Sequence, residues 1–103
     1  MARILIIEDN GELQQLLSLT FTREGYEVHY AFNGKEGYDK ILSLQPDIIL
    51  LDLMMPVLNG VEVIKLVSTN TSVRDIPIVV MTAHGDQADM LEPGKWFVIR
   101  HGA

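Results

Sequence analysis

The sequence of 103 residues contains no cysteine, which excludes a disulfide framework and a thiolate metal site. Basic residues are few: 8 lysines and arginines stand against 14 acidic residues, so the net charge is −6. Nucleic-acid binding normally needs a basic surface that displaces counterions from phosphates, so direct binding to nucleic acid is not expected. Long apolar runs are also missing. The run from Ile4 to Ile7 is too short for a signal peptide or a membrane span, so we expect no membrane contact and a cytoplasmic location.

Hydrophobic residues make up 48% of the chain, which is enough for one folded core, and no linker or repeat is visible. Short apolar runs alternate with segments of helical periodicity. Such runs suit parallel strands covered on both faces, and right-handed crossovers then place helices on both sides of the sheet. The expected strands are 4–7, 27–30, 47–51 and 77–81. Three helices are expected to follow Asn10, Asn33 and Gly60, and a fourth, short helix is expected at 85–91.

The helical spacing of apolar residues also predicts which side chains face the core. In the first expected helix they are Leu13, Leu16, Leu17, Thr20 and Phe21. In the second they are Tyr38, Ile41 and Leu42, and in the third they are Val61, Ile64 and Val67.

Polar side chains come directly after three of the four expected strands. Glu8 and Asp9 follow the first strand, Asp52 follows the third, and Thr82 follows the fourth. In open α/β sheets ligands bind beyond the carboxyl ends of the strands, and in a flavodoxin-like sheet strands one and three are neighbours where the winding reverses. A single acid after a strand is more often a helix cap or a solvated loop residue. The combination, however, predicts that the three acids converge.

Three carboxylates placed together repel one another, so at least one pKa should rise unless a cation compensates. A hard cation with oxygen ligands is the natural partner. Mg²⁺ suits a site with few carboxylates that leaves positions for water and phosphate oxygens. Asp52 can act as a nucleophile toward phosphorus, because carboxylates form acyl phosphates, and the Thr82 hydroxyl can donate a hydrogen bond to a phosphoryl oxygen.

Three motifs make the chain resemble the receiver domain of bacterial two-component response regulators. They are Ile-Leu-Ile-Ile-Glu-Asp-Asn at 4–10, Pro-Asp-Ile-Ile-Leu-Leu-Asp-Leu-Met-Met-Pro-Val-Leu-Asn-Gly at 46–60, and Ile-Pro-Ile-Val-Val-Met-Thr-Ala at 76–83. The resemblance covers residues 3–91 of what we expect to be a single receiver domain, residues 1–103. It implies a flavodoxin-like, doubly wound parallel sheet with strand order 2-1-3-4-5.

The same resemblance assigns roles to individual residues. The Mg²⁺ ligands would be Glu8, Asp9, Asp52 and the backbone carbonyl of Met54. Asp52 would be the phosphoacceptor and Thr82 the switch hydroxyl, while Ala83 would keep the approach to the phosphate open. The implied partners are a histidine kinase, a phosphotransfer protein or a small phosphodonor. No enzymatic activity is expected beyond self-phosphorylation and autodephosphorylation.

The tail, residues 92–103, departs from the family, and the last helix of a receiver is missing from it. One interpretation keeps a fifth strand at 96–99, with Phe97 as the switch aromatic and Arg100 in place of the usual lysine. Arg and Lys are not interchangeable there, because a forked planar cation replaces a compact ammonium. The other interpretation is that the tail is truncated or replaced, and the lysine has no counterpart. The sequence is compatible with both interpretations.

Without the last helix, one face of the sheet is expected to lack its usual cover. That helix normally covers one face of the sheet, and a large apolar patch or an open sheet edge invites association. We therefore expect a homodimer through the exposed surface, a swapped arrangement or low stability.

Three functions can be considered for this sequence. The first is a phosphoacceptor switch or phosphorelay shuttle, and the second is a receiver-like interaction module that no longer switches. The third is an aspartate-dependent phosphatase, which needs a second acid two residues after the nucleophile. Met54 occupies that position, so we set the third aside.

Overall fold

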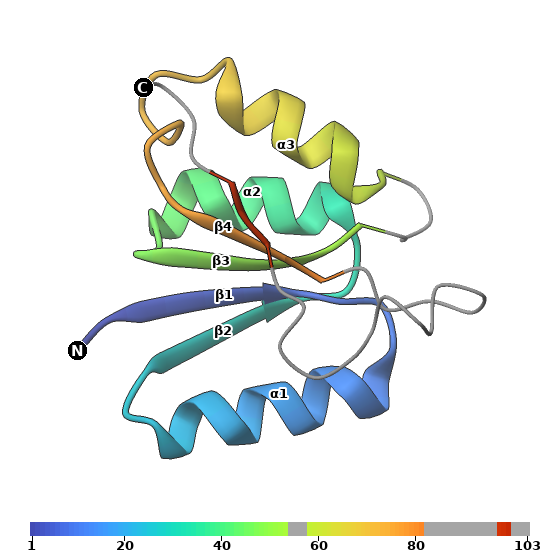
Figure 1. Ribbon diagram of the computed structural model, residues 1–103, viewed down its shortest axis with the longest axis vertical. Helices are drawn as coiled ribbons and strands as arrows, with labels where there is room; N and C mark the ends of the chain where they lie inside the picture. The colour runs from blue at the N-terminus through green and yellow to red at the C-terminus, as the bar shows by residue number, and fades with distance from the viewer. Residues whose placement is uncertain (54–57, 82–96, 100–103) are drawn as a thin grey trace.

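The computed structural model describes residues 1–53, 58–81 and 97–99, which form one twisted sheet with helices on both faces (Figure 1). The strands are β1 (Arg3–Ile7), β2 (Glu27–Ala31), β3 (Ile48–Asp52), β4 (Ile78–Met81) and β5 (Phe97–Ile99). The helices are α1 (Gly11–Arg23), α2 (Gly34–Leu44) and α3 (Gly60–Ser68). The order β2-β1-β3-β4-β5 confirms the flavodoxin-like fold predicted from the sequence.

Within the described ranges three helices are present, and none follows β4. The helix expected at 85–91 lies outside the described residues. None of the described helices is both long and apolar enough to cross a membrane.

Strand β5 corrects the expectation of a wholly parallel sheet. The four strands β1 to β4 pair in parallel, whereas β5 pairs with β4 in the antiparallel direction. Val80 stands opposite Phe97, and Ile78 stands opposite Ile99. A three-residue apolar run carries no information about direction, and an antiparallel edge strand on an otherwise parallel sheet is common. The carboxyl end of β5 therefore lies beside the amino end of β4.

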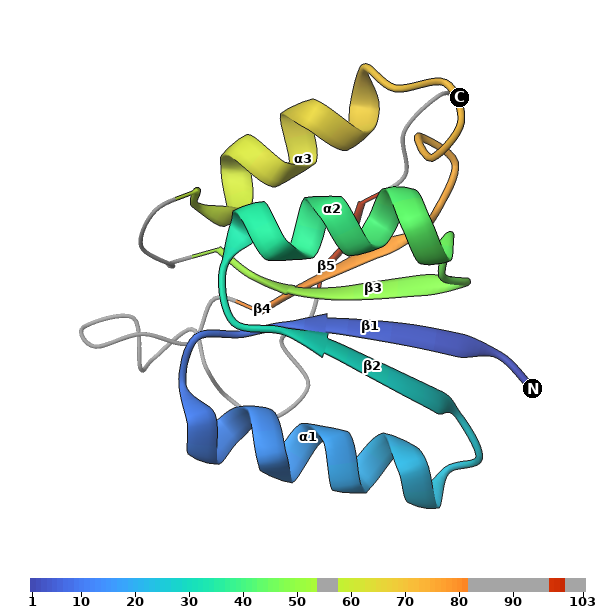
Figure 2. The same ribbon diagram turned by 180° about the vertical axis from the view of Figure 1, so that it is seen from behind.

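Two apolar cores lie on opposite faces of the sheet, because successive strand residues point to opposite sides. Helices α2 and α3 cover one face and α1 covers the other, as Figure 2 shows from behind. The larger core includes Leu5, Ile7, Ile49, Leu51, Ile41, Val63 and Val67. The smaller core, under α1, consists of Ile4, Ile6, Leu17, Leu50 and Met81, with Leu13 and Phe21 packed against it.

The predicted helix faces were partly wrong. Leu16 and Val61 are 59% and 48% exposed, and Leu42 and Thr20 are also exposed. The buried positions of α1 are Gln14 and Leu17. The face of α1 that packs on the sheet therefore includes a polar residue, which a search for apolar residues passes over. The buried side of α3 is formed by Val63 and Val67. Tyr38 and Ile41 of α2 pack as expected.

Each described helix begins with the dipeptide Asn-Gly, in which the asparagine is the N-cap. The side chains of Asn10, Asn33 and Asn59 accept hydrogen bonds from backbone N–H groups three residues later, at 3.0, 2.8 and 3.0 Å. Such a cap satisfies an N–H group that has no partner inside the helix, and contributes about 1 kcal/mol. The caps fix where each helix starts, immediately beyond the carboxyl end of a strand.

The outer edge of β2 is covered by two side chains of α2. Lys40 Nζ donates to the carbonyl oxygen of Tyr30 at 2.5 Å and lies 5.3 Å from the centre of the Tyr30 ring. Glu36 Oε1 accepts a hydrogen bond from the backbone N–H of Phe32 at 2.6 Å. One backbone group of this edge strand, and one of the residue just beyond its end, thus have partners within the chain.

Helix α2 ends at Gln45, which has φ 48° and ψ 63° and is the only residue other than glycine with positive φ in the described chain. The left-handed conformation costs an L-residue roughly 1 kcal/mol, and glycine avoids that cost. We expect Gln45→Gly to raise the free energy of unfolding by about 0.5–1 kcal/mol. Urea denaturation checks this, with Gln45→Ala as the control that should give no gain. A loss of stability in Gln45→Gly would contradict the expectation.

Candidate metal and phosphoacceptor site

Three acids meet at the carboxyl ends of β1 and β3. The β1–β3 register pairs Ile7 with Leu51, so Glu8 and Asp52 occupy the next positions of the two strands. One carboxylate oxygen from each of Glu8, Asp9 and Asp52 lies within 4.8 Å of the others. The structure therefore brings together the three acids that the sequence singled out.

The three carboxylates differ sharply in their exposure. Glu8 is 1% exposed and Asp52 is fully buried, whereas Asp9 is exposed. Glu8 Oε2 accepts a hydrogen bond from the backbone N–H of Asn10 at 2.9 Å, which turns its side chain back toward the start of α1. The cluster thus has a buried floor and one carboxylate at its open side.

Burial is the main reason why the pKa of Glu8 is raised from 4.5 to about 8. The hydrogen bond from the Asn10 backbone lowers that pKa, while hydrogen bonds to Asp9 and Asp52 and the charge of Asp52 raise it. This agrees with the expectation that at least one carboxyl would resist ionisation in the absence of a compensating cation. Without a cation, burial therefore disfavours the ionised form of Glu8.

The donor set fits a divalent cation. A cation between the carboxylates would favour their ionised forms and offset the desolvation that raises the pKa of Glu8. Three carboxylates, of which one faces outward, leave room for water or phosphate oxygens, as Mg²⁺ coordination requires. The arrangement can therefore hold a hard cation directly beside the Asp52 carboxylate.

The backbone around Asp52 is held by hydrogen bonds and by the close packing of Gly60. Leu53 N donates to the carbonyl oxygen of Met81 at 3.2 Å, and Gly60 N donates to the carbonyl oxygen of Leu53 at 3.1 Å. Gly60 lies so close to this segment that a built Cβ would be 2.7 Å from the carbonyl oxygen of Asp52. The start of α3 therefore packs directly on the chain that carries Asp52.

Several predicted site residues stay predictions. Met54, Thr82, Ala83 and Arg100 lie outside the described residues. The backbone of Phe97 is placed in β5, opposite Val80, but its side chain is not described. Ile99, which precedes Arg100 in the chain, stands beside Ile78, at the opposite end of β4 from the residue that pairs with Asp52.

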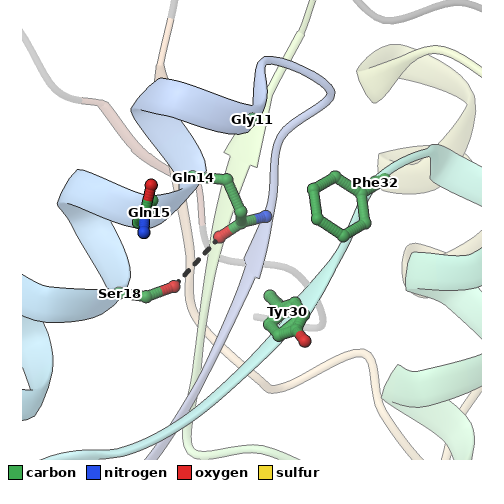
Figure 3. Close-up of a pocket in the computed structure, with 6 residues that line it drawn as sticks. All are labelled: Gly11, Gln14, Gln15, Ser18, Tyr30 and Phe32. Atoms are coloured by element: carbon green, nitrogen blue, oxygen red, sulfur yellow. Dashed lines mark hydrogen bonds between the residues drawn. The ribbon is translucent and has the colours of Figure 1, made fainter.

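Gln14 is a buried residue near the site that the sequence prediction missed. Its side-chain amide donates to the carbonyl oxygens of Ile6 and Ala31 and to that of Glu8. Figure 3 shows it beside a groove between α1 and β2. The groove has a volume of about 310 Å³ and is lined by Gly11, Gln14, Gln15, Ser18, Tyr30 and Phe32. The only signal in the sequence is a glutamine five residues after Asp9.

Known proteins match this chain over most of its length. The family model of the response regulator receiver domain matches residues 4–95. Response regulator ArlR of Staphylococcus aureus is 40% identical over 89 residues, which cover 86% of this chain and 39% of that protein. The chain thus spans well under half the length of this curated relative.

Solved structures agree with the observed fold. The chemotaxis response regulator CheY4 of Vibrio cholerae superimposes with a TM-score of 0.78 at 31% identity, covering 86% of this chain and 74% of that one. The N-terminal domain of a response regulator receiver protein from Methanoculleus marisnigri JR1 gives a TM-score of 0.78 at 29% identity, covering 86% of this chain and 72% of that one.

Proposed function

Because the chain belongs to the response regulator receiver domain family, we propose that it is a phosphoacceptor signalling domain in which Asp52 is phosphorylated with the help of Mg²⁺. The observation that carries the proposal is the position of Asp52, fully buried at the end of β3 and within 4.8 Å of two further carboxylates. A site of this kind places a nucleophilic oxygen beside a cation that neutralises the incoming phosphoryl group.

In the proposed step a carboxylate oxygen of Asp52 attacks the phosphorus of a phosphohistidine or of a small phosphodonor. The new O–P bond makes an acyl phosphate, the bond from phosphorus to the leaving group breaks, and the leaving group takes up a proton. Glu8 and Asp9 would hold Mg²⁺, which would neutralise negative charge on the phosphoryl oxygens. The packing of Gly60 on the backbone of Asp52 keeps the nucleophile fixed for in-line attack.

The proposed partners follow from the same chemistry. A histidine kinase or a phosphotransfer protein would deliver the phosphoryl group, in the cytoplasm. We propose no enzymatic activity beyond phosphorylation and dephosphorylation of Asp52. Met54, Thr82 and Ala83 complete the proposed site through a carbonyl ligand, a hydroxyl donor and an open approach, respectively.

Incubation with a small phosphodonor and Mg²⁺ is expected to add the mass of one phosphoryl group, and Asp52→Asn is expected to abolish the increase, because it removes the nucleophilic oxygen. Asp47→Asn is a matched control. Asp47 stands just before β3, at its opposite end, and contacts the backbone of Arg3 at 2.7 Å. Intact-protein mass spectrometry at neutral pH is the measurement. The absence of a mass increase in the wild-type chain would contradict the proposal.

The second candidate is a receiver-like interaction module that does not switch. The antiparallel direction of β5 favours it, because the carboxyl end of that strand points away from Asp52. An unphosphorylated chain that still binds Mg²⁺ would support this second candidate.

A further inference from the structure

Three polar or charged side chains are buried in the part of the chain that the structure describes. They are Glu8, Gln14 and Asp52, which are 1%, 3% and 0% exposed. Two of them belong to the acidic cluster. Buried polar groups are costly unless they are hydrogen-bonded, so the third requires a structural or functional reason.

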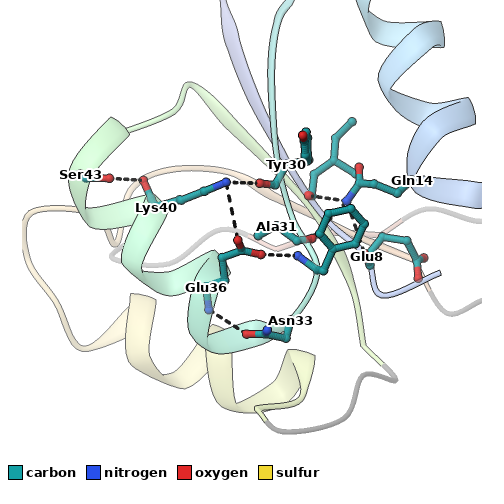
Figure 4. A network of polar contacts seen from close by, with 10 residues as sticks. Glu8, Gln14, Tyr30, Ala31, Asn33, Glu36, Lys40 and Ser43 are labelled. Atoms are coloured by element: carbon teal, nitrogen blue, oxygen red, sulfur yellow. Dashed lines mark hydrogen bonds and ion pairs between the residues drawn. The ribbon is translucent and has the colours of Figure 1, made fainter. Parts of the chain in front are cut away.

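Gln14 Nε2 makes contacts that no apolar side chain can make. It donates to the carbonyl oxygen of Ile6 at 3.0 Å, to that of Ala31 at 3.1 Å, and at a longer 3.4 Å to that of Glu8. The first is in β1, the second is the last residue of β2, and the third is in the acidic cluster itself. One amide from α1 therefore joins the ends of two strands at the point where Glu8 leaves the sheet (Figure 4).

The orientation of this amide is set by its neighbours. Its Oε1 accepts a hydrogen bond from Ser18 Oγ, one helical turn further along α1, at 3.3 Å. The reverse orientation would place Oε1 against three carbonyl oxygens, which cannot donate. The N–H groups of Gln14 thus point toward the backbone at Glu8.

The backbone of Glu8 has one further anchor at this point. Its N–H donates to the carbonyl oxygen of Ala31 at 3.1 Å, and this oxygen also accepts from Gln14. Without Gln14, the carbonyl oxygens of Ile6 and Glu8 would each lose a buried donor, and the direction in which the Glu8 and Asp9 side chains leave the strand would be less fixed. A displacement of about 1 Å at such a site is enough to weaken a metal complex or a reaction.

We propose that Gln14 is a positioning residue that sets the Mg²⁺ affinity of the acidic cluster by fixing the backbone at Glu8. The inference rests on the proposed function, since it concerns the same Mg²⁺ site. Gln14 does not touch the cation. Groups that orient metal ligands commonly change metal affinity about 10-fold to 100-fold when they are replaced.

A purely structural role for Gln14 makes a different prediction. If the amide only satisfied buried carbonyls, its loss would lower the melting temperature and leave the dissociation constant of the folded protein unchanged. The two roles are separated by measuring Mg²⁺ binding well below the melting temperature of every variant.

The test compares Gln14→Met with Gln15→Met by isothermal titration calorimetry with Mg²⁺ as the only ligand. Methionine keeps the length of the side chain and removes its hydrogen-bond donors. Gln15 is the adjacent residue of α1, lines the same groove and is exposed, so it is a matched control. We expect the dissociation constant to rise about tenfold in Gln14→Met and by less than about twofold in Gln15→Met.

A second variant covers the case in which Gln14→Met does not fold. Ser18→Ala keeps the donors of Gln14 and removes the partner of its oxygen, so a smaller but measurable weakening of Mg²⁺ binding is expected. An unchanged dissociation constant in the folded variants, while the wild-type chain binds Mg²⁺, would overturn this inference alone. A wild-type chain that neither binds Mg²⁺ nor forms an acyl phosphate would overturn the proposed function together with it.

Discussion

Alanine at Gly60 or at Gly34 is expected to lower the free energy of unfolding by about 1–3 kcal/mol, whereas alanine at Gly11 is expected to leave it unchanged or raise it slightly. The three glycines occupy equivalent places, each directly after the asparagine that caps its helix. Helix propensity alone predicts a gain of up to about 1 kcal/mol at all three. Packing reverses the sign at two of them.

The difference comes from what a new Cβ would meet. At Gly60 it would lie 2.5 Å from the Cα of Leu53 and 2.7 Å from the carbonyl oxygen of Asp52. At Gly34 it would lie 2.8 Å from the carbonyl carbon of Leu58 and closer still to its oxygen. These are backbone atoms, which cannot turn aside as a flexible side chain can. At Gly11 no atom lies within 4 Å.

Urea denaturation of the three alanine variants measures this series, and Gly11→Ala is the internal control for the helix-start position. Because Gly60 packs on Asp52, we also expect Gly60→Ala to weaken Mg²⁺ binding, which titration calorimetry measures. Equal stability of the three variants would mean that Gly34 does not pack so closely on Leu58, nor Gly60 on Leu53.

In the absence of metal, Asp52→Asn is expected to raise the melting temperature at alkaline pH by about 5 °C or more, because about 1 kcal/mol corresponds to 4–8 °C in a domain of this size. The substitution removes one of two buried carboxylates that lie within 4.8 Å of each other. At pH 5 the difference should shrink, because Glu8 then carries its proton and repels Asp52 less. An unchanged or lower melting temperature at alkaline pH would argue that the three carboxylates do not meet.

The pH dependence of the wild-type chain follows from the raised pKa of Glu8. Its pKa is about 8 when folded and near the ordinary 4.5 when unfolded, so between these values the folded chain holds more protons than the unfolded chain. The contribution of Glu8 to the free energy of unfolding is therefore fully present below pH 4.5 and is lost as the pH rises toward 8. Between these values the free energy of unfolding falls by up to about 1.4 kcal/mol per pH unit.

Thermal melts in a metal chelator from pH 5 to pH 8.5 measure this loss. Glu8→Gln should flatten the curve more than Asp52→Asn, since burial, not the charge of Asp52, is the main cause of the raised pKa. With excess Mg²⁺ the wild-type chain should have a higher melting temperature than Asp52→Asn, the reverse of the order without metal. A ligand that binds only the folded state stabilises it, and the variant lacks one of the proposed Mg²⁺ ligands. A wild-type curve that rises across this range would contradict the assignment to Glu8.

The acidic cluster was predictable because it depends on connectivity. Acids that directly follow two neighbouring parallel strands must meet at the same edge, and the β1–β3 register places Glu8 and Asp52 side by side. The order of the strands was predicted from the resemblance to receiver domains. The positions of the acids at the strand ends were predicted from the short apolar runs and their spacing in the sequence.

Two features were not predictable from periodicity. Hydropathy counts apolar residues, so it placed Leu16 inside and gave no weight to Gln14, whose amide is buried because backbone carbonyls need its donors. The direction of β5 depends on the path of the preceding chain, which three apolar residues do not encode. In α1 the predicted face was therefore wrong because a hydrogen-bonding need, and not hydrophobicity, decided that Gln14 is buried.

The partners that Lys40 and Glu36 provide along the outer edge of β2 limit how this domain joins with other chains. An open strand edge is a template for a further strand, and sheets grow or aggregate by adding one there. The carbonyl oxygen of Tyr30 and the N–H of Phe32 already have partners in α2. A strand from another molecule would have to displace both, so pairing through β2 is disfavoured. If the dimer predicted from the sequence forms, we expect its contacts to lie away from this edge.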